Sequence, residues 1–331
     1  MKSLDQYWYE SSFIPWLLLP LSWLYCLIAI IRRKLYRLNI LKSYRSQIPV
    51  IVIGNIVAGG SGKTPLLLSL CDYIEQKGFR PGVVSRGYGG SVNGVKQVQE
   101  NDLAAEIGDE PLMIFQRTGL PVVVGADRVA AVNYLLENND CDVVLSDDGL
   151  QHYRMQRELE IAVVDSERGF GNGFCLPAGP LRERKSRLQE VDIIVSNGFN
   201  TRSVDDCSYS LQIVSLNRLS DDESSDLSSF LHKSVHAVAG IGNPDRFFRQ
   251  LRHNGVELIE HAFADHHSYQ QADFSGWSED CIIMTEKDAV KCAKLQLPDA
   301  WVVKVVADFS DTLESQLAAR LLPLLKHQAN R

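Results

Sequence analysis

The chain has 331 residues, which leaves room for about two domains. Its apolar content of 45% and charged content of 23% are ordinary for a globular protein, and a net charge of −7 at pH 7 gives no reason to expect nucleic-acid binding. Seven cysteines are scattered without a Cys-x-x-Cys pair, which predicts reduced thiols in a cytosolic compartment and no zinc site.

A hydrophobic helix is the first element that the sequence predicts. Residues Phe13 to Ile31 carry no charge, and as a helix they would be about 28 Å long, close to the ~30 Å hydrocarbon core of a bilayer. Basic residues cluster directly afterwards, at 32–37, which predicts that the bulk of the chain lies in the cytoplasm. Pro15 and Pro20 disfavour a spanning helix, so a helix lying in the membrane interface is favoured almost equally, and a buried core helix is the third alternative.

A phosphate-binding loop is expected after a buried strand at 50–53. The segment Gly59-Gly60-Ser61-Gly62-Lys63-Thr64 lies between that strand and a helix expected over 65–77. Glycines let backbone N–H groups approach phosphate oxygens, the lysine reaches the β- and γ-phosphates, and the threonine hydroxyl ligates Mg²⁺. A glycine-rich turn with an accidental Gly-Lys-Thr is the alternative, and the flanking strand and helix argue against it.

The loop departs from the strict P-loop pattern at Val57, where that pattern has a glycine. Its doublet Gly59-Gly60 instead resembles the loop of the nucleotide-switch ATPases that carry Gly-Gly-x-Gly-Lys-Thr. Those that work as dimers usually place a lysine where Ala58 stands. The loop therefore predicts phosphate binding without that dimeric mechanism.

Short apolar runs alternate with helical patterns, for example the helix expected over 126–137. This alternation predicts a P-loop NTPase-like, doubly wound α/β/α domain, in which ligands bind beyond the carboxyl ends of parallel strands. Further runs near the C-terminus predict a second, smaller α/β domain. The expected strands are 50–53, 82–85, 122–125, 143–145, 161–164 and 193–196 in the first domain, 211–216 in the link, and 235–239, 256–259, 281–284 and 301–306 in the second.

These patterns divide the chain into four parts. We predict an N-terminal membrane-associated helix at 1–36, a P-loop domain at 37–203, a linker at 204–229 and the smaller domain at 230–331. The linker is assigned because the chain turns strongly polar around 220–229. Two connected domains imply a cleft that can close over a substrate.

Two aspartates end the apolar run at 143–145. Asp147 and Asp148 follow a buried strand, as expected of a Walker-B element in which an aspartate meets Mg²⁺ directly or through water. A helix cap or a turn is the alternative. Asp147 is the preferred ligand, whereas Asp148 could bind a second metal or hold a water molecule.

Further charged side chains fall near predicted strand ends or turns. Asp109, in Gly-Asp-Glu-Pro, stands where a helix is expected to begin, and capping or accepting a proton from a sugar hydroxyl are equally favoured. Arg182 and Glu183 follow a stiff Pro-Ala-Gly-Pro turn. The guanidinium suits phosphate and the carboxylate could ligate a metal, although local sequence slightly favours a surface ion pair. Arg86 and Arg128 are further candidates for a phosphate or sugar contact.

The second domain contributes the adjacent histidines His266 and His267, which would rarely bind one metal because neighbouring side chains point in different directions. Such a pair usually belongs to a turn or surface. If His266 reaches across the cleft, it could hydrogen-bond a catalytic carboxylate and tune it. The segment Thr285-Glu-Lys-Asp288 is not the Asn/Thr-Lys-x-Asp pattern that reads guanine, which favours ATP over GTP.

Taken in order, these segments resemble the tetraacyldisaccharide 4′-kinase family, the lipid A 4′-kinases of Gram-negative bacteria. The resemblance covers about residues 50–290, and the hydrophobic N-terminal helix extends it. No single motif beyond the P-loop is specific, but the ordered set is. The matching segments are Gly54-Asn55, Gly59–Pro65, Ser85–Gly89, Gly108–Pro111, Asp147–His152, Pro177–Glu183, Asp265–His267 and Thr285–Asp288.

The resemblance implies a kinase that uses ATP and Mg²⁺ to phosphorylate the 4′-hydroxyl of tetraacyldisaccharide 1-phosphate, a late step in making lipid A. It implies two α/β/α domains joined by a β-strand linker, with the active site between them. Because the substrate is a membrane lipid, the enzyme is expected at the cytoplasmic face of the bacterial inner membrane, with no nucleic acid and no obligate protein partner.

The same resemblance implies roles for the phosphate and metal residues. Residues Gly59 to Thr64 would bind the nucleotide, with Lys63 neutralising its β- and γ-phosphates. Thr64, Asp147 and Glu183 would form the metal environment.

It also implies roles in the transfer itself. Asp109 would be the base that takes the 4′-hydroxyl proton, with His266 orienting it or sharing the proton. Arg182 would stabilise charge on the transferring phosphoryl group. These roles agree with phosphoryl-transfer chemistry, and a carboxylate base fits if the cleft raises its pKa.

The competing prediction is a membrane-associated P-loop NTPase switch that acts on a protein partner. Ala58, the missing guanine motif and the scattered cysteines count against it. The two predictions differ in whether ATP turnover requires a lipid acceptor. A third alternative, a soluble sugar or nucleoside kinase, leaves the apolar run at 13–31 unexplained.

Overall fold

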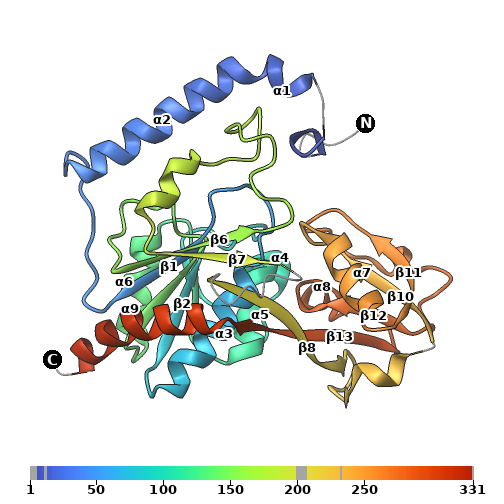
Figure 1. Cartoon of the computed structure of the whole chain (residues 1–331). Helices are drawn as coiled ribbons and strands as arrows, with labels where there is room; N and C mark the ends of the chain where they lie inside the picture. The colour runs from blue at the N-terminus through green and yellow to red at the C-terminus, as the bar shows by residue number, and fades with distance from the viewer. Residues whose placement is uncertain (1–5, 11–12, 199–206, 232, 330–331) are drawn as a thin grey trace.

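The computed structural model describes residues 6–10, 13–198, 207–231 and 233–329. It has two α/β units, with an N-terminal helix lying across the larger one (Figure 1). A single sheet runs through both units in the order β11-β10-β12-β13-β8-β7-β6-β1-β5-β2-β4-β3, with β9 paired to β8. The predicted fold class is confirmed, and the two units share this sheet.

The larger unit contains the parallel part of the sheet that carries the P-loop. Its strand β1 lies between β5 and β6, and helices cover both faces, which is why the strands are continuous apolar runs. The elements are β1 (Val50–Gly54), β2 (Pro81–Ser85), the antiparallel edge strand β3 (Val95–Gln97), β4 (Val122–Gly125), β5 (Val143–Asp147), β6 (Leu159–Asp165), β7 (Ile193–Asn197), α3 (Lys63–Gln76), α4 (Ala104–Ile107), α5 (Asp109–Thr118), α6 (Arg128–Asn138) and η2 (Lys185–Glu190).

Helix α3 forms because its apolar residues recur at helical spacing. Leu66, Leu70 and Ile74 are buried on one face, against the same side of the sheet as alternate residues of β1. Gly62 precedes the helix in the left-handed region, and Gly78 follows it in the same region. The helix therefore begins directly at the end of the glycine-rich loop.

The smaller unit continues the sheet through two long strands. Strands β8 and β13 pair antiparallel and run from one unit to the other (Figure 1). The elements here are β8 (Ser208–Arg218), β9 (Ser224–Ser225), η3 (Leu227–Phe230), β10 (Ser234–Ala239), α7 (Pro244–His253), β11 (Glu257–Ala262), η4 (Gln271–Phe274), β12 (Ile282–Thr285), α8 (Glu286–Cys292) and β13 (Ala300–Phe309).

The last helix, α9 (Asp311–Ala329), returns to the larger unit. Its leucines at four-residue spacing are fully buried in the same core cluster as α3 and β1. Our predicted boundaries assigned this segment to the smaller domain at 230–331, whereas its apolar face packs against the P-loop unit. The predicted junction at 203 and 204 lies outside the described residues. These leucines are Leu313, Leu317, Leu321 and Leu325.

The N-terminal segment forms η1 (Gln6–Trp8), α1 (Ile14–Leu17) and α2 (Leu19–Arg37). One side of α2 is attached to the larger unit: the Ser22 hydroxyl donates to the carbonyl of Cys175 at 2.7 Å, and Cys26 forms a disulfide with Cys175. The prediction that all the cysteines are reduced is therefore wrong for this pair, which the fold brings together across 149 positions of sequence.

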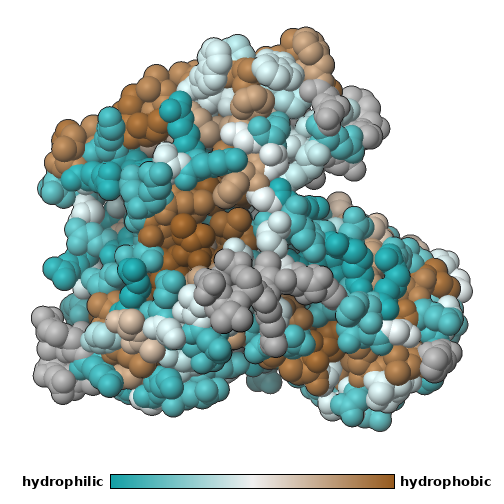
Figure 2. Space-filling model, viewed as in Figure 1, coloured by the Kyte–Doolittle hydropathy of each residue, from teal (hydrophilic) through white to brown (hydrophobic). Residues whose placement is uncertain are grey.

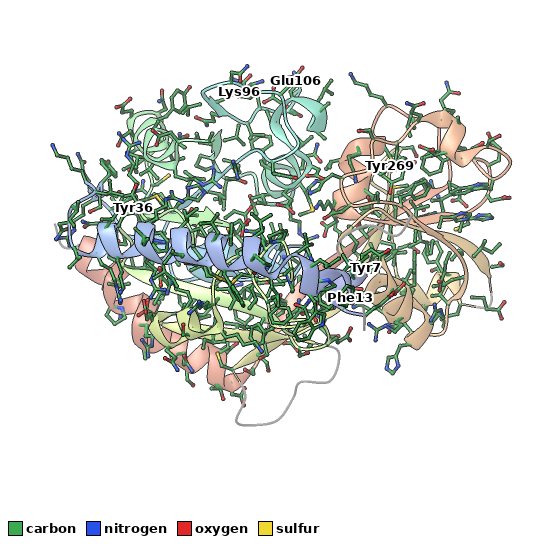
Figure 3. The ribbon with its side chains drawn as sticks, turned by 90° about the horizontal axis from the view of Figure 1, so that it is seen from above. Tyr7, Phe13, Tyr36, Lys96, Glu106 and Tyr269 are labelled. Carbon is green, nitrogen blue, oxygen red and sulfur yellow. A yellow bond between two sulfur atoms is a disulfide. The ribbon has the colours of Figure 1, made fainter. Side chains whose placement is uncertain are left out.

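The other side of α1 and α2 is exposed and apolar. Trp16, Leu24 and Leu27 are 60%, 53% and 54% exposed, and Figure 2 shows apolar residues along the outer edge of this segment. Viewed from above, the N-terminal segment passes from Tyr36 across the larger unit toward Phe13, at its end nearer the smaller unit in this view (Figure 3). No helix in the described part of the chain combines the length and hydrophobicity needed to cross a membrane.

Candidate active site

The glycine-rich loop connects β1 to α3 and is fixed by side chains from neighbouring strands. Gly62 has a φ of 84°, and a Cβ there would lie 1.8 Å from Asn197 Nδ2, so only glycine fits. Asn197 donates to the carbonyl of Ser61 at 2.9 Å, and the Tyr209 hydroxyl donates to the carbonyl of Gly62 at 2.5 Å. The predicted phosphate-binding residues therefore lie at the carboxyl end of β1.

Lys63 and Arg182 meet at one carboxylate. Lys63 Nζ lies 3.5 Å from Asp148 Oδ1, and Arg182 donates to Asp148 Oδ2 at 2.6 Å. Burial alone would raise the Asp148 pKa, but the two cations hold it far below its usual value. Asp148 therefore gathers the two positive side chains that phosphate oxygens require, a role that its place after β5 did not reveal.

Asp147, at the end of β5, is suited to a cation. Its side chain is buried, Ser85 donates to Oδ2 at 3.3 Å, and Oδ1 has no hydrogen-bond partner among the described residues. Burial, and then the charges of Glu110 and Asp148, raise the Asp147 pKa to about 7. A buried carboxylate oxygen without a donor fits Mg²⁺, and Thr64, another expected ligand, lines the cavity beside the P-loop.

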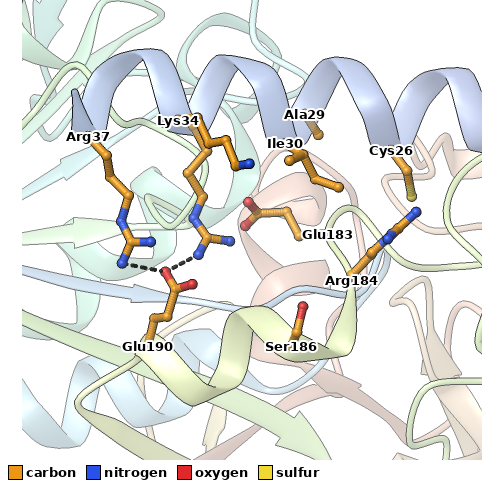
Figure 4. Close-up of a pocket in the computed structure, with 10 residues that line it drawn as sticks. Cys26, Ala29, Ile30, Lys34, Arg37, Glu183, Arg184, Ser186 and Glu190 are labelled. Carbon is orange, nitrogen blue, oxygen red and sulfur yellow. Dashed lines mark ion pairs between the residues drawn. The ribbon is translucent and has the colours of Figure 1, made fainter. Parts of the chain in front are cut away.

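Glu183 lies elsewhere. It lines a small pocket beneath α2, beside Lys34 and near the ion pair of Arg37 with Glu190 (Figure 4). Its two oxygens accept hydrogen bonds from the Tyr153 hydroxyl and, at 3.1 Å, from the side chain of Gln151. The structure does not bring Glu183 into the cavity that Thr64 lines, so its metal role stays a prediction.

Asp109 and His266 form a pair across the two units. Asp109 is the first residue of α5 and 5% exposed, while His266 lies in the loop after β11, with a φ of 61°. His266 Nδ1 is 2.9 Å from Asp109 Oδ2, and the backbone N–H of Glu110 donates to Asp109 Oδ1 at 2.9 Å. The reach across the cleft that we expected of His266 is present.

The electrostatics of the pair correct one expectation. Burial alone would raise the Asp109 pKa, but the hydrogen bond with His266 and the charge of Lys287 outweigh it and lower that pKa. The same hydrogen bond raises the His266 pKa. The condition stated for a carboxylate base, a pKa raised by the cleft, is therefore not met at Asp109, whose pKa is lowered.

Lys287 is a member of this site that the sequence did not single out. Its ammonium group lies 3.1 Å from Glu110, 3.1 Å from Asp265 and 3.9 Å from Asp109. We considered its segment as a possible guanine motif and as one of the segments of the family resemblance, without giving the lysine a role. The sequence did contain one indication of its role: Lys287 follows a predicted strand of the smaller domain, and the carboxyl ends of such strands face the ligand-binding cleft.

A cavity of about 180 Å³ lies beside the P-loop, and its lining includes Glu110 and Lys287 from the surroundings of Asp109. The P-loop lines one wall, and residues of α7, α8 and β13 line the other. The loop after β10 touches the P-loop so closely that a Cβ on Gly242 would lie 2.7 Å from the backbone nitrogen of Gly60. The apolar part of the wall is made by Leu68, Met113, Leu211, Phe247, Val303 and Val305.

The remaining candidates support the site rather than form it. Arg128 is buried and donates to the backbone carbonyls of Gly125 and Asp147, so it fixes the end of β5. Burial, followed by the nearby arginines, lowers the His152 pKa to about 4 and keeps that ring neutral. His267 does not join the pair, because its Nε2 lies 3.0 Å from Asp273 within its own unit.

The P-loop cavity is lined by Lys287, whose ammonium group lies 3.9 Å from Asp109 of the Asp–His pair, so the site meets the two needs of phosphoryl transfer to a hydroxyl, namely phosphate binding and proton acceptance. The fold and site thus define a P-loop kinase. The chain belongs to the tetraacyldisaccharide-1-P 4′-kinase family, whose model matches residues 14–322. This membership confirms the predicted family and makes the chain a phosphotransferase with an alcohol group as acceptor.

Similar proteins cover nearly the whole chain. The tetraacyldisaccharide 4′-kinase of Hahella chejuensis is 45% identical over 98% of this chain and 98% of that protein. That of Methylobacillus flagellatus is 43% identical over 98% and 97%. Among solved structures, LpxK from Aquifex aeolicus, in complex with ATP, matches with a TM-score of 0.80 and 26% identity over 95% of this chain and 100% of that one. The alternative of an NTPase switch is not favoured.

Proposed function

We propose that the chain transfers the γ-phosphoryl group of ATP to the 4′-hydroxyl of tetraacyldisaccharide 1-phosphate, with Asp109 and His266 as the proton-accepting pair. One observation carries this proposal. Lys287 lines the P-loop cavity and also contacts Asp109, so phosphate binding and proton acceptance meet at one point between the units. The family membership supports the substrate class.

The phosphate end of the reaction uses the P-loop and two cations. Lys63 and Arg182 both contact Asp148, which places two cationic side chains together beside the P-loop. In the transition state, charge spreads over the oxygens of the transferring phosphoryl group, and fixed cations stabilise it without reorganisation. The apolar wall of the cavity suits an adenine ring.

Thr64 and Asp147 are the residues that would hold Mg²⁺, and Glu183 remains a proposed third ligand. When bound, Mg²⁺ supplies charge neutralisation at the β- and γ-phosphate oxygens. The buried Oδ1 of Asp147, which accepts no hydrogen bond among the described residues, is the observation that supports this assignment.

The acceptor end of the reaction uses the Asp109–His266 pair. The 4′-oxygen attacks the γ-phosphorus, the bond from that phosphorus to the bridging oxygen of ADP breaks, and the proton of the hydroxyl passes to the pair. Both oxygens of Asp109 already accept hydrogen bonds, so the pair takes this proton as a unit. Asp109 orients the imidazole and stabilises the charge that the proton brings.

We also propose that the enzyme works at the cytoplasmic face of the bacterial inner membrane. A cleft of about 1200 Å³ opens between the N-terminal segment and both units, and its lining includes Trp16, Gly59 and Asp265. Pro15 and Trp16 of α1 line this cleft, and the exposed apolar side of α1 and α2 could enter the bilayer surface, so that a lipid would present its sugar to the site.

ATP turnover with and without lipid acceptor tests the proposed reaction. In detergent micelles with Mg²⁺, we expect ATP consumption only when tetraacyldisaccharide 1-phosphate is present, and its loss in Lys63→Ala. Acceptor-independent hydrolysis that still needs Lys63 would favour the NTPase switch with a protein partner.

Vesicle flotation tests the proposed location. Leu24→Asp with Leu27→Asp places two charges on exposed positions, so the fold and the melting temperature should be retained while binding to phospholipid vesicles falls about tenfold or more. Unchanged vesicle binding by the folded double variant would move the membrane contact to another surface.

A further inference from the structure

We propose that Lys287 is a positioning residue of this site: its ammonium group, carried by the smaller unit, holds the Asp109–His266 pair in its proton-accepting charge state at the edge of the P-loop cavity. The inference rests on the proposed function, because it assigns a role within the same site.

The contacts of Lys287 come from both units. Glu110 and Asp109 begin helix α5 of the larger unit, at 3.1 Å and 3.9 Å from Nζ, and Asp265 belongs to the loop after β11, at 3.1 Å. Lys287 itself lies on α8, directly after β12. One ammonium group therefore connects the carboxylates on the two sides of the cleft, next to the hydrogen bond between Asp109 and His266.

Burial makes this charge effective. The Lys287 side chain is 14% exposed, and a buried ammonium is tolerated only when it is paired. Burial alone would lower its pKa, but the surrounding carboxylates outweigh burial and raise it. Lys287 is therefore positively charged throughout the physiological pH range, and solvent screens it little.

The other groups that face the pair replace the positive charge of Lys287 only in part. Glu110 on α5 and Asp265 on the neighbouring loop are both carboxylates, and the Tyr88 ring lies 5.0 Å from the His266 ring. Lys291, one turn further along α8, forms an ion pair with Asp288 at 2.9 Å and lowers the Asp109 pKa less than Lys287 does, and Lys294 lines the same pocket as Asp109 and His266. Without Lys287 the carboxylates that face the pair would be less fully compensated, and the pair would keep a proton at a higher pH.

A second ion pair between α5 and α8 provides a control that distinguishes an electrostatic effect of Lys287 on the pair from a purely structural link between the two helices. Arg117 lies about two turns along α5 from Asp109 and donates to Glu286 of α8 at 2.8 Å. Arg117 and Glu286 are also largely buried. Replacing Arg117 removes an α5–α8 ion pair of similar burial without changing the charge beside Asp109.

The test is the dependence of kcat on pH for the full-length enzyme in micelles, with ATP, Mg²⁺ and lipid acceptor saturating. In Lys287→Met we expect the acid limb, the fall of kcat toward low pH, to shift to higher pH by about one unit. On that limb kcat should be about tenfold lower than in the wild type, and it should recover at higher pH. Lys287→Arg should keep the wild-type limb. Arg117→Met should also keep it, even if its melting temperature falls.

Glu110→Gln provides a second test in case Lys287→Met folds poorly. Removing a carboxylate that faces the pair should move the acid limb down in pH, opposite to the loss of Lys287. An equal loss of kcat at every pH in Lys287→Met, or the same shift of the acid limb in Arg117→Met, would overturn the inference and assign Lys287 a purely structural role. An unmoved limb in folded Glu110→Gln would overturn it as well. If the wild-type enzyme does not phosphorylate the lipid, the proposed function itself is refuted.

Discussion

Replacing Asp109 with asparagine perturbs the proton-accepting pair while keeping its shape. The carboxylate is 5% exposed and 2.9 Å from His266 Nδ1, so its negative charge acts on the imidazole with little screening. Positioned acid–base catalysis is worth about 10²- to 10⁴-fold. We expect Asp109→Asn to lower kcat by a factor in this range, equivalent to about 3–5 kcal/mol of transition-state free energy.

The assay should separate kcat from the KM for ATP. Asp109 does not line the P-loop cavity, so that KM should change by less than about threefold. Asp273→Asn is the matched control, because Asp273 forms the same kind of pair with His267, at 3.0 Å, within the smaller unit. A kcat for Asp109→Asn equal to that of the wild type, or equal loss in Asp273→Asn, would refute the reasoning.

Three further measurements follow from the structure. The His266 pKa is raised above 6.5, so the pair gains an extra proton, and loses the ability to accept one, as the pH falls through that raised value. The fall of kcat on the acid side of its pH profile should therefore have its midpoint above pH 6.5, and a midpoint below 6.5 would contradict this. Gly62→Ala should lose ATP binding and melt several degrees below Gly78→Ala, which has the same φ of 84° but open space around it; equal melting would refute the crowding against Asn197. Leu317→Ala in urea unfolding should cost about 2–5 kcal/mol if α9 is part of the P-loop core, and a cost below about 1 kcal/mol would refute that packing.

The strands were predictable because both faces of each are covered. Such strands are short apolar runs bounded by turn residues, and the runs at 50–53, 122–125 and 235–239 correspond to β1, β4 and β10 within one residue at each end. The same pattern says nothing about which strands pair. The long β8–β13 pair and the return of α9 depend on contacts between distant segments, and so the sequence pattern did not reveal them.

The candidate site divides in the same way. Gly62, Lys63 and Asp147 were found because their motifs have a fixed order of strand, loop and helix. The contact of Asp109 with His266 came only from the family resemblance, since 157 positions separate the two residues. Lys287 was missed because its role depends on carboxylates from both units, and none of them is near it in sequence.

The pKa of the base shows why burial alone is a poor guide. Sequence reasoning held that a carboxylate base fits if the cleft raises its pKa, and burial of Asp109 does act in that direction. The hydrogen bond with His266 and the charge of Lys287, both from the smaller unit, reverse the outcome, and of these two residues only His266 was expected beside Asp109, through the family resemblance. The direction of a shift in such a cluster depends on which opposite charge comes within about 4–6 Å.

Transfer of ³²P from γ-labelled ATP to tetraacyldisaccharide 1-phosphate tests the central claim most directly. The assay compares wild type with Lys63→Ala and His266→Ala, and it locates the new phosphate by ³¹P NMR of the product. The account predicts a lipid labelled at the 4′-position, formed by the wild type and lost or slowed at least about 100-fold in both variants. Labelling at another hydroxyl, or full activity in either folded variant, would contradict it.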